Sequence, residues 1–68
     1  MKPRILTDFG KRVRDLRDER GISQERLGEL AKVHRTYVGM IERGEKNITL
    51  TSMEKFAKAL QVEVRDLL

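Results

Sequence analysis

The sequence predicts an all-α domain of five short helices, and three of its features support that prediction. Apolar residues recur at intervals of three and four positions, the spacing that places them on one face of a helix. Glycines and cap-forming serine and threonine residues separate these segments, as short helices joined by tight turns require. No segment shows the strict alternation of a half-buried strand, and no repeat or linker divides the chain. We therefore expect one compact domain over residues 1–68, with a thin core because the chain is short.

The first predicted helix covers residues 8–20. Thr7 and Asp8 form a suitable N-cap pair ahead of it, and Gly21 supplies a C-terminal stop. Its buried stripe consists of Phe9, Val13 and Leu16.

Two shorter helices follow, separated by about three residues. One covers residues 24–31 behind a Ser23 cap, and Gly28 leaves room in it for a close neighbour. The other covers residues 35–43 and ends at Gly44. The residues expected to face inward are Leu27, Leu30, Ala31, Val38 and Ile41.

Two further helices complete the prediction. Thr49 or Thr51 can cap the fourth, and Thr51 with Glu54 fits a capping box. The turn at residues 61–63 leads into a short fifth helix. The fourth helix has an apolar stripe of Leu50, Met53, Phe56, Ala57 and Leu60. The fifth carries Val64, Leu67 and Leu68, an apolar end that we expect a monomer to leave partly exposed.

Positive charge is concentrated at the N-terminal end of the chain. The formal net charge is +4 and the isoelectric point is about 9.9, a balance that favours polyanions as partners. Residues 1–20 hold seven Lys and Arg against four Asp and Glu, whereas residues 48–68 hold three against three. This asymmetry suits a module whose first two-thirds faces phosphate while its last third packs on an uncharged surface. A solvated charged surface is the alternative.

Two other classes of protein are disfavoured. No apolar run approaches the ~20 residues that span a bilayer, and the first six residues lack the apolar stretch of a secretory signal. Cysteine is absent, and one histidine, His34, cannot supply the usual number of metal ligands, so it is interpreted as a substitute N-cap. No glycine-rich phosphate loop or catalytic cluster occurs. We expect a soluble cytoplasmic protein that is not an enzyme, with no cofactor, metal or membrane partner.

The segments 24–31 and 35–43 have the pattern of a helix-turn-helix. Helices that cross steeply need a small residue where they touch, and Gly28 meets that need. The second helix then protrudes and fits the major groove of DNA, with its N-terminal residues nearest the base edges. Arg35 at its entry can make a bidentate contact to guanine, and Thr36 offers a hydroxyl and a methyl group to a base edge.

The sequence resembles the Cro/repressor-like (XRE-type) helix-turn-helix family over nearly its whole length. The segments that carry the resemblance are GISQERL (21–27), RTYV (35–38), IERG (41–44) and AKALQV (57–62). Within the family, HRTY (34–37) and IERGEKN (41–47) are most similar to the controller proteins of restriction-modification systems. Lys32 and Glu63 depart from the family pattern, which usually has Gly and Ser there.

The resemblance implies a sequence-specific regulator that binds double-stranded DNA as a homodimer and autoregulates. Controllers activate at one operator occupancy and repress at a higher one. Residues expected to contact base edges are Arg35, Thr36 and Lys46; those expected to contact the backbone are Ser23, Gln24, Tyr37, Arg43, Asn47 and Ser52. For Tyr37, a ring packed on the flank of the 24–31 helix is the alternative.

The resemblance also implies a structural ion pair between Arg17 and Glu42 behind the recognition surface. We expect Val64, Leu67 and Leu68 to form the dimer interface and place two half-sites about 10 bp apart in a pseudo-palindromic operator.

An antitoxin-like protein, with the same fold and partner binding as its main role, is the alternative function. Against it, Arg35, Thr36, Arg43 and Lys46 give the predicted outer edge polar side chains rather than an apolar stripe. RNA is disfavoured because its A-form major groove is too narrow for a helix. We expect no small-molecule effector, because a domain this small has little room for a ligand pocket.

Overall fold

The computed structural model describes residues 3–68, and this part of the chain is helical without any strand. It contains the α-helices α1 (Arg4–Glu19), α2 (Gln24–Ala31), α3 (Arg35–Glu42) and α4 (Leu50–Leu60). A short 3-10 helix, η1 (Val64–Leu67), follows them. The all-α prediction is therefore confirmed, but the fifth α-helix is wrong. None of these helices is long and apolar enough to cross a membrane.

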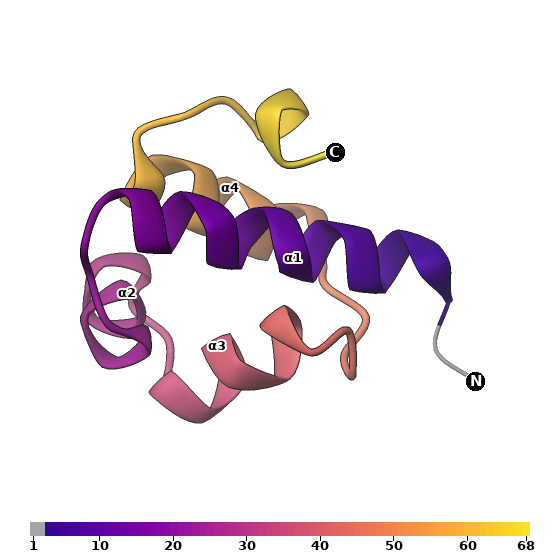
Figure 1. Ribbon diagram of the computed structural model, residues 1–68, viewed down its shortest axis with the longest axis horizontal. Coiled ribbons are helices and arrows are strands. Elements are labelled where there is room, and N and C mark those ends of the chain that lie inside the picture. Colours follow the sequence, from indigo (N-terminus) through magenta and orange to yellow (C-terminus); the bar gives the residue numbers. More distant parts are fainter. Residues whose placement is uncertain (1–2) are drawn as a thin grey trace.

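The helices enclose a single core. In Figure 1, α1 crosses the middle of the molecule with α4 behind it, α2 and α3 lie on one side, and η1 lies on the other. α2 packs on both α3 and α4, α1 packs on α3, and η1 covers α1 and α4. The buried apolar residues are Phe9, Val13, Leu16, Leu27, Ala31, Val38, Ile41, Phe56, Ala57, Leu60 and Leu67.

The first helix begins a turn earlier than the sequence predicts. Pro3 occupies the N-cap position with φ −58°, and a proline there removes no helical hydrogen bond. The Thr7 hydroxyl donates to the Arg4 carbonyl oxygen at 2.9 Å, and the Asp8 carboxylate lies 3.5 Å from the Arg4 guanidinium. The predicted cap residues Thr7 and Asp8 therefore lie inside α1.

The fourth helix is capped by Thr49, whose hydroxyl accepts from the Ser52 backbone N–H at 3.1 Å. The capping box of Thr51 and Glu54 is wrong. Leu50 becomes the first helical residue and is 77% exposed instead of joining the apolar stripe. Leu30, expected in the core, is 41% exposed, because it borders open hollows beside α4 instead of entering the core.

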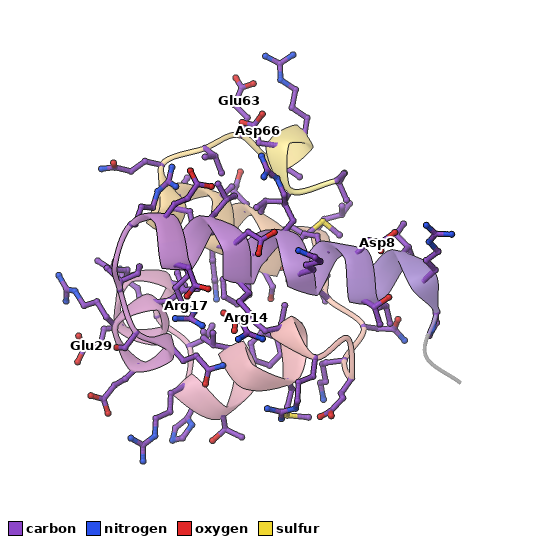
Figure 2. The ribbon with its side chains drawn as sticks, viewed as in Figure 1. Asp8, Arg14, Arg17, Glu29, Glu63 and Asp66 are labelled. Atoms are coloured by element: carbon purple, nitrogen blue, oxygen red, sulfur yellow. The ribbon has the colours of Figure 1, made fainter. Side chains whose placement is uncertain are left out.

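The C-terminal turn is a 3-10 helix of four residues, since a segment this short gains little from α-helical hydrogen bonds. Glu63 precedes it, and its backbone N–H donates to the Asp66 carboxylate at 2.9 Å. Figure 2 shows both side chains together beside this turn. The Arg12 guanidinium donates to the Asp66 carbonyl oxygen at 2.9 Å and so ties η1 to α1.

Candidate nucleic-acid interface

α2 and α3 form a helix-turn-helix joined by residues 32–34. Gly28 provides the close approach that the sequence predicts, because a Cβ there would lie 2.7 Å from the Val33 carbonyl oxygen. Lys32 adopts the left-handed conformation with φ 60°, where the family usually has glycine. A non-glycine residue pays ~1–2 kcal/mol for this conformation.

Helix α3, which we name the recognition helix because the sequence predicts that it enters the major groove, starts at a histidine cap. His34 Nδ1 accepts from the Thr36 backbone N–H at 3.0 Å, which confirms the predicted substitute N-cap. The inner face of α3 buries Val38 and Ile41, and its first turn leaves Arg35 and Thr36 exposed. Two of the three residues expected to contact bases therefore project from the start of a rigidly packed helix.

Arg35 makes an ion pair that the sequence did not reveal. Its Nη1 lies 2.9 Å from Glu25 Oε2, and both side chains are exposed. Exposed ion pairs contribute little in water, so Arg35 can leave Glu25 for another partner at low cost. The pair holds the guanidinium beside the first turn of α2.

A buried ion pair connects α1 to the end of α3. Arg17 Nε lies 2.7 Å from Glu42 Oε2, and Nη2 donates to Oε1 at 3.1 Å, so the contact is bidentate. The side chain of Glu42 is 4% exposed and that of Arg17 is 12% exposed. The hydrogen bond to Glu42 raises the pKa of Arg17, although burial acts in the opposite direction. In Figure 2, Arg17 extends from α1 toward α2 and α3.

Two further hydrogen bonds extend this network to α2. Arg17 Nη1 donates to the Ile22 carbonyl oxygen at 2.9 Å, just before α2 begins. Gln24 Nε2 donates to Glu42 Oε1 at 3.0 Å. One glutamate thus holds side chains from α1 and α2, and Gln24 is fixed by a contact within the protein as well as placed beside the predicted phosphate site.

The ring of Tyr37 packs on a helix that the sequence did not suggest. It stacks on Phe56 of α4, with ring centroids 6.2 Å apart and planes 9° apart. The residue is half-buried, so the ring is part of the core edge. The predicted backbone contact now depends on its hydroxyl group alone.

The remaining predicted DNA contacts flank α3. Ser23 caps α2 and accepts from the Arg26 backbone N–H at 2.9 Å. Arg43 pairs with Glu45 at 3.0 Å, immediately after α3. Lys46 and Asn47 are exposed in the loop that follows, and Ser52 accepts from the Thr49 hydroxyl at 3.0 Å in the first turn of α4.

The predicted dimer surface needs one correction. Leu67 is 1% exposed because η1 packs it onto α1 and α4, so it belongs to the core of its own chain. Leu68 is 73% exposed, and Val64 is half-buried. Ile5 of α1 is also exposed and borders the same shallow hollow as Leu68.

Comparisons with known proteins agree with this architecture. The family model described as helix-turn-helix matches residues 13–67. The control protein C.BamHI of Bacillus amyloliquefaciens is 46% identical over 61 residues, which cover 88% of this chain and 75% of that protein. The control protein C.SmaI of Serratia marcescens is 45% identical over 60 residues, which cover 88% of this chain and 71% of that protein.

The solved structures point the same way. The restriction-modification controller protein C.AhdI from Aeromonas hydrophila superimposes with a TM-score of 0.91 at 46% identity, over 93% of this chain and 96% of that one. Because both the family model and these relatives span most of the sequence, this chain belongs to the Cro/repressor-like helix-turn-helix family of DNA-binding regulators, which are not enzymes.

Proposed function

We propose that this protein is a restriction-modification controller that binds a pseudo-palindromic operator as a homodimer and regulates its own gene. The observation that carries the proposal is the exposed first turn of α3. Arg35 and Thr36 project there from a helix fixed by the His34 cap and by the buried Arg17–Glu42 pair. The similarity to control proteins over most of the chain supports the narrower assignment.

The expected contacts divide by chemistry. Arg35 makes a bidentate contact to guanine, and Thr36 and Lys46 contact neighbouring base edges. The N-terminus of α2, with Ser23 and Gln24, offers backbone N–H groups to a phosphate oxygen. The further backbone contacts are those of Tyr37, Arg43, Asn47 and Ser52.

The size of the domain suits two copies on adjacent half-sites. Its longest dimension is 29 Å, and half-sites one helical turn apart are separated by about 34 Å. Contact through Leu68, Val64 and Ile5 buries apolar surface that the single chain leaves exposed. Dimerisation and cooperative filling of paired sites then make regulation depend on protein concentration.

Selection from random duplex DNA at moderate salt tests this function. We expect enrichment of a two-fold motif with half-site centres about 10 bp apart. A second, tandem step of occupancy supports the controller assignment. If no sequence is enriched above non-specific binding, the DNA function fails and an antitoxin-like role takes its place.

The selected motif allows base contacts to be separated from backbone contacts. We expect Arg35→Ala to lose about 1–3 kcal/mol of discrimination at one base pair of each half-site. Gln24→Ala should weaken binding to every duplex by a similar factor, because its partner is a phosphate. Fluorescence anisotropy on single-base variants of the motif measures both effects. Thermal melts check that each variant is still folded, because Gln24 also donates a hydrogen bond to Glu42. Equal losses on all duplexes for both variants would show that Arg35 does not contact a base.

The dimer surface is tested by adding charge to it. Leu68→Glu places a carboxylate in the proposed interface and is expected to weaken dimerisation by at least tenfold, the equivalent of about 1.4 kcal/mol. Analytical ultracentrifugation across a concentration series measures the dissociation constant. Leu30→Glu, which charges an exposed leucine on α2, is the control and should leave the dimer intact. Unchanged dimerisation in Leu68→Glu would place the interface elsewhere.

A further inference from the structure

A second surface of the protein combines exposed apolar side chains with an excess of positive charge. Two hollows lie next to each other between α2 and α4, and both are bordered by Leu30 and Lys58. Together they form a continuous depression, which we name the α2–α4 groove. It is bordered by four cations, one carboxylate and several apolar or neutral residues: Arg20, Lys32, Lys55, Lys58, Glu54, Ile22, Leu30, Ala31, Ala59, Thr51 and Gln61.

The middle of the groove is apolar. Leu30 is 41% exposed although its neighbours on α2, Leu27 and Ala31, are buried. Ile22 and Ala59 are half-buried beside it and pack against the edge of the core. These side chains form an apolar floor that no residue of the described chain, 3–68, covers.

The rim of the groove carries four cations and one carboxylate, Glu54, which leaves an excess of positive charge. Arg20, Lys32, Lys55 and Lys58 form no ion pair with any residue in the described part of the chain, and Arg20 bonds only the Leu16 carbonyl oxygen. This differs from most other arginines of the surface, which lie within 4 Å of a carboxylate; examples are Arg4, Arg14, Arg26, Arg35 and Arg43.

The groove is separate from both surfaces described above. None of the residues expected to contact DNA borders it, and neither do Val64, Leu68 or Ile5. On α2, Leu30 lies six residues after Gln24, which places it roughly 120° around the helix from the phosphate-facing N-terminus. A ligand in the groove leaves the recognition helix and the proposed dimer surface accessible.

We propose that the α2–α4 groove binds an acidic amphipathic helix of a partner protein. An apolar stripe on such a helix covers Leu30 and Ala59. Carboxylates on its two flanks pair with Lys55 and Lys58 of α4 and with Arg20 and Lys32, which follow α1 and α2. Complementary charge of this kind determines the orientation and the rate of association. Duplex DNA fits less well, because its phosphates match the rim but leave the apolar floor uncovered.

A designed peptide tests the proposed chemistry without knowledge of the natural partner. The probe is a labelled peptide of about 18 residues, or five helical turns, with leucines at three- and four-residue spacing and glutamates on both flanks. The control has the same composition in a scrambled order that breaks the leucine stripe. We expect the amphipathic peptide to bind at least tenfold more tightly than the scrambled one, with NMR shifts at Leu30, Lys55 and Lys58. Equal affinities would show that only net charge is sensed and would overturn the proposal.

Matched variants place the binding site. Leu30→Ser and the double variant Lys55→Glu, Lys58→Glu are each expected to weaken peptide binding about tenfold or more. Lys11→Glu, a charge reversal on α1, is the control and should change it less than twofold. Thermal melts verify that each variant is folded. The peptide titrations contain no DNA, so their outcome does not depend on the proposed operator function. If the double variant instead loses affinity for duplex DNA and keeps its affinity for the peptide, the rim is a phosphate contact and the proposal is wrong.

Discussion

Glu42→Ala is expected to lower the free energy of unfolding by about 3–5 kcal/mol, the usual cost of removing one partner from a buried ion pair. The glutamate is almost fully buried and accepts from Arg17 through both oxygens and from Gln24 through one. Its removal leaves the largely buried Arg17 charge with the Ile22 carbonyl oxygen and the exposed carboxylate of Asp18, 3.4 Å away, as its partners. Small domains have ~5–15 kcal/mol of stability in total, so the variant should be close to unfolding.

Urea unfolding followed by circular dichroism measures this loss, and two further variants separate its causes. Glu29→Ala removes an exposed carboxylate from a 3.0 Å pair with Arg26 and should cost at most about 1 kcal/mol. Glu42→Gln keeps the shape of the side chain and one acceptor oxygen. Its loss of unfolding free energy should therefore lie between those of Glu42→Ala and Glu29→Ala. A loss below about 1 kcal/mol for Glu42→Ala would show that water reaches the pair as freely as it reaches an exposed one.

The helical order of the chain was predictable because apolar periodicity is a local signal. The α2 bounds agree with the predicted 24–31, and the stripe of Phe9, Val13 and Leu16 is buried. Local signals were ambiguous at helix starts. Thr7 and Asp8 are residue types that often cap a helix, yet Pro3 is the N-cap of α1. Only the folded backbone distinguishes these two possible starts.

Side-chain roles that depend on tertiary packing were not predictable. Apolar residues at the end of a chain fit a core or an interface equally well, and the packing of η1 decides that Leu67 belongs to the core while Leu68 does not. The Glu25–Arg35 pair joins residues ten positions apart, which meet only because α2 and α3 cross at a particular angle. The Arg17–Glu42 pair was expected from family resemblance, since no pattern in the sequence connects residues 25 positions apart.

The contact between α1 and α3 depends on Gly10. A Cβ at this position would lie 2.7 Å from the Glu42 carbonyl oxygen and still closer to that of Ile41. Both atoms belong to the backbone at the end of α3 and cannot rotate away. Intrinsic propensity alone favours alanine over glycine in a helix by about 1 kcal/mol, so the two effects have opposite signs.

We expect the steric effect to dominate, so that Gly10→Ala lowers the free energy of unfolding by at least about 2 kcal/mol. The two helices must separate to admit the methyl group, which also strains the Arg17–Glu42 pair beside it and displaces the recognition helix. Urea unfolding provides the measurement, and DNA affinity at temperatures where the variant is folded reports the displacement. Gly39→Ala is the matched control: its nearest atom is the mobile end of Arg43, at 3.0 Å, so alanine there should be neutral or stabilising. If Gly10→Ala also proves neutral, α1 and α3 can separate freely, and the buried ion pair rather than close backbone contact fixes the position of the recognition helix.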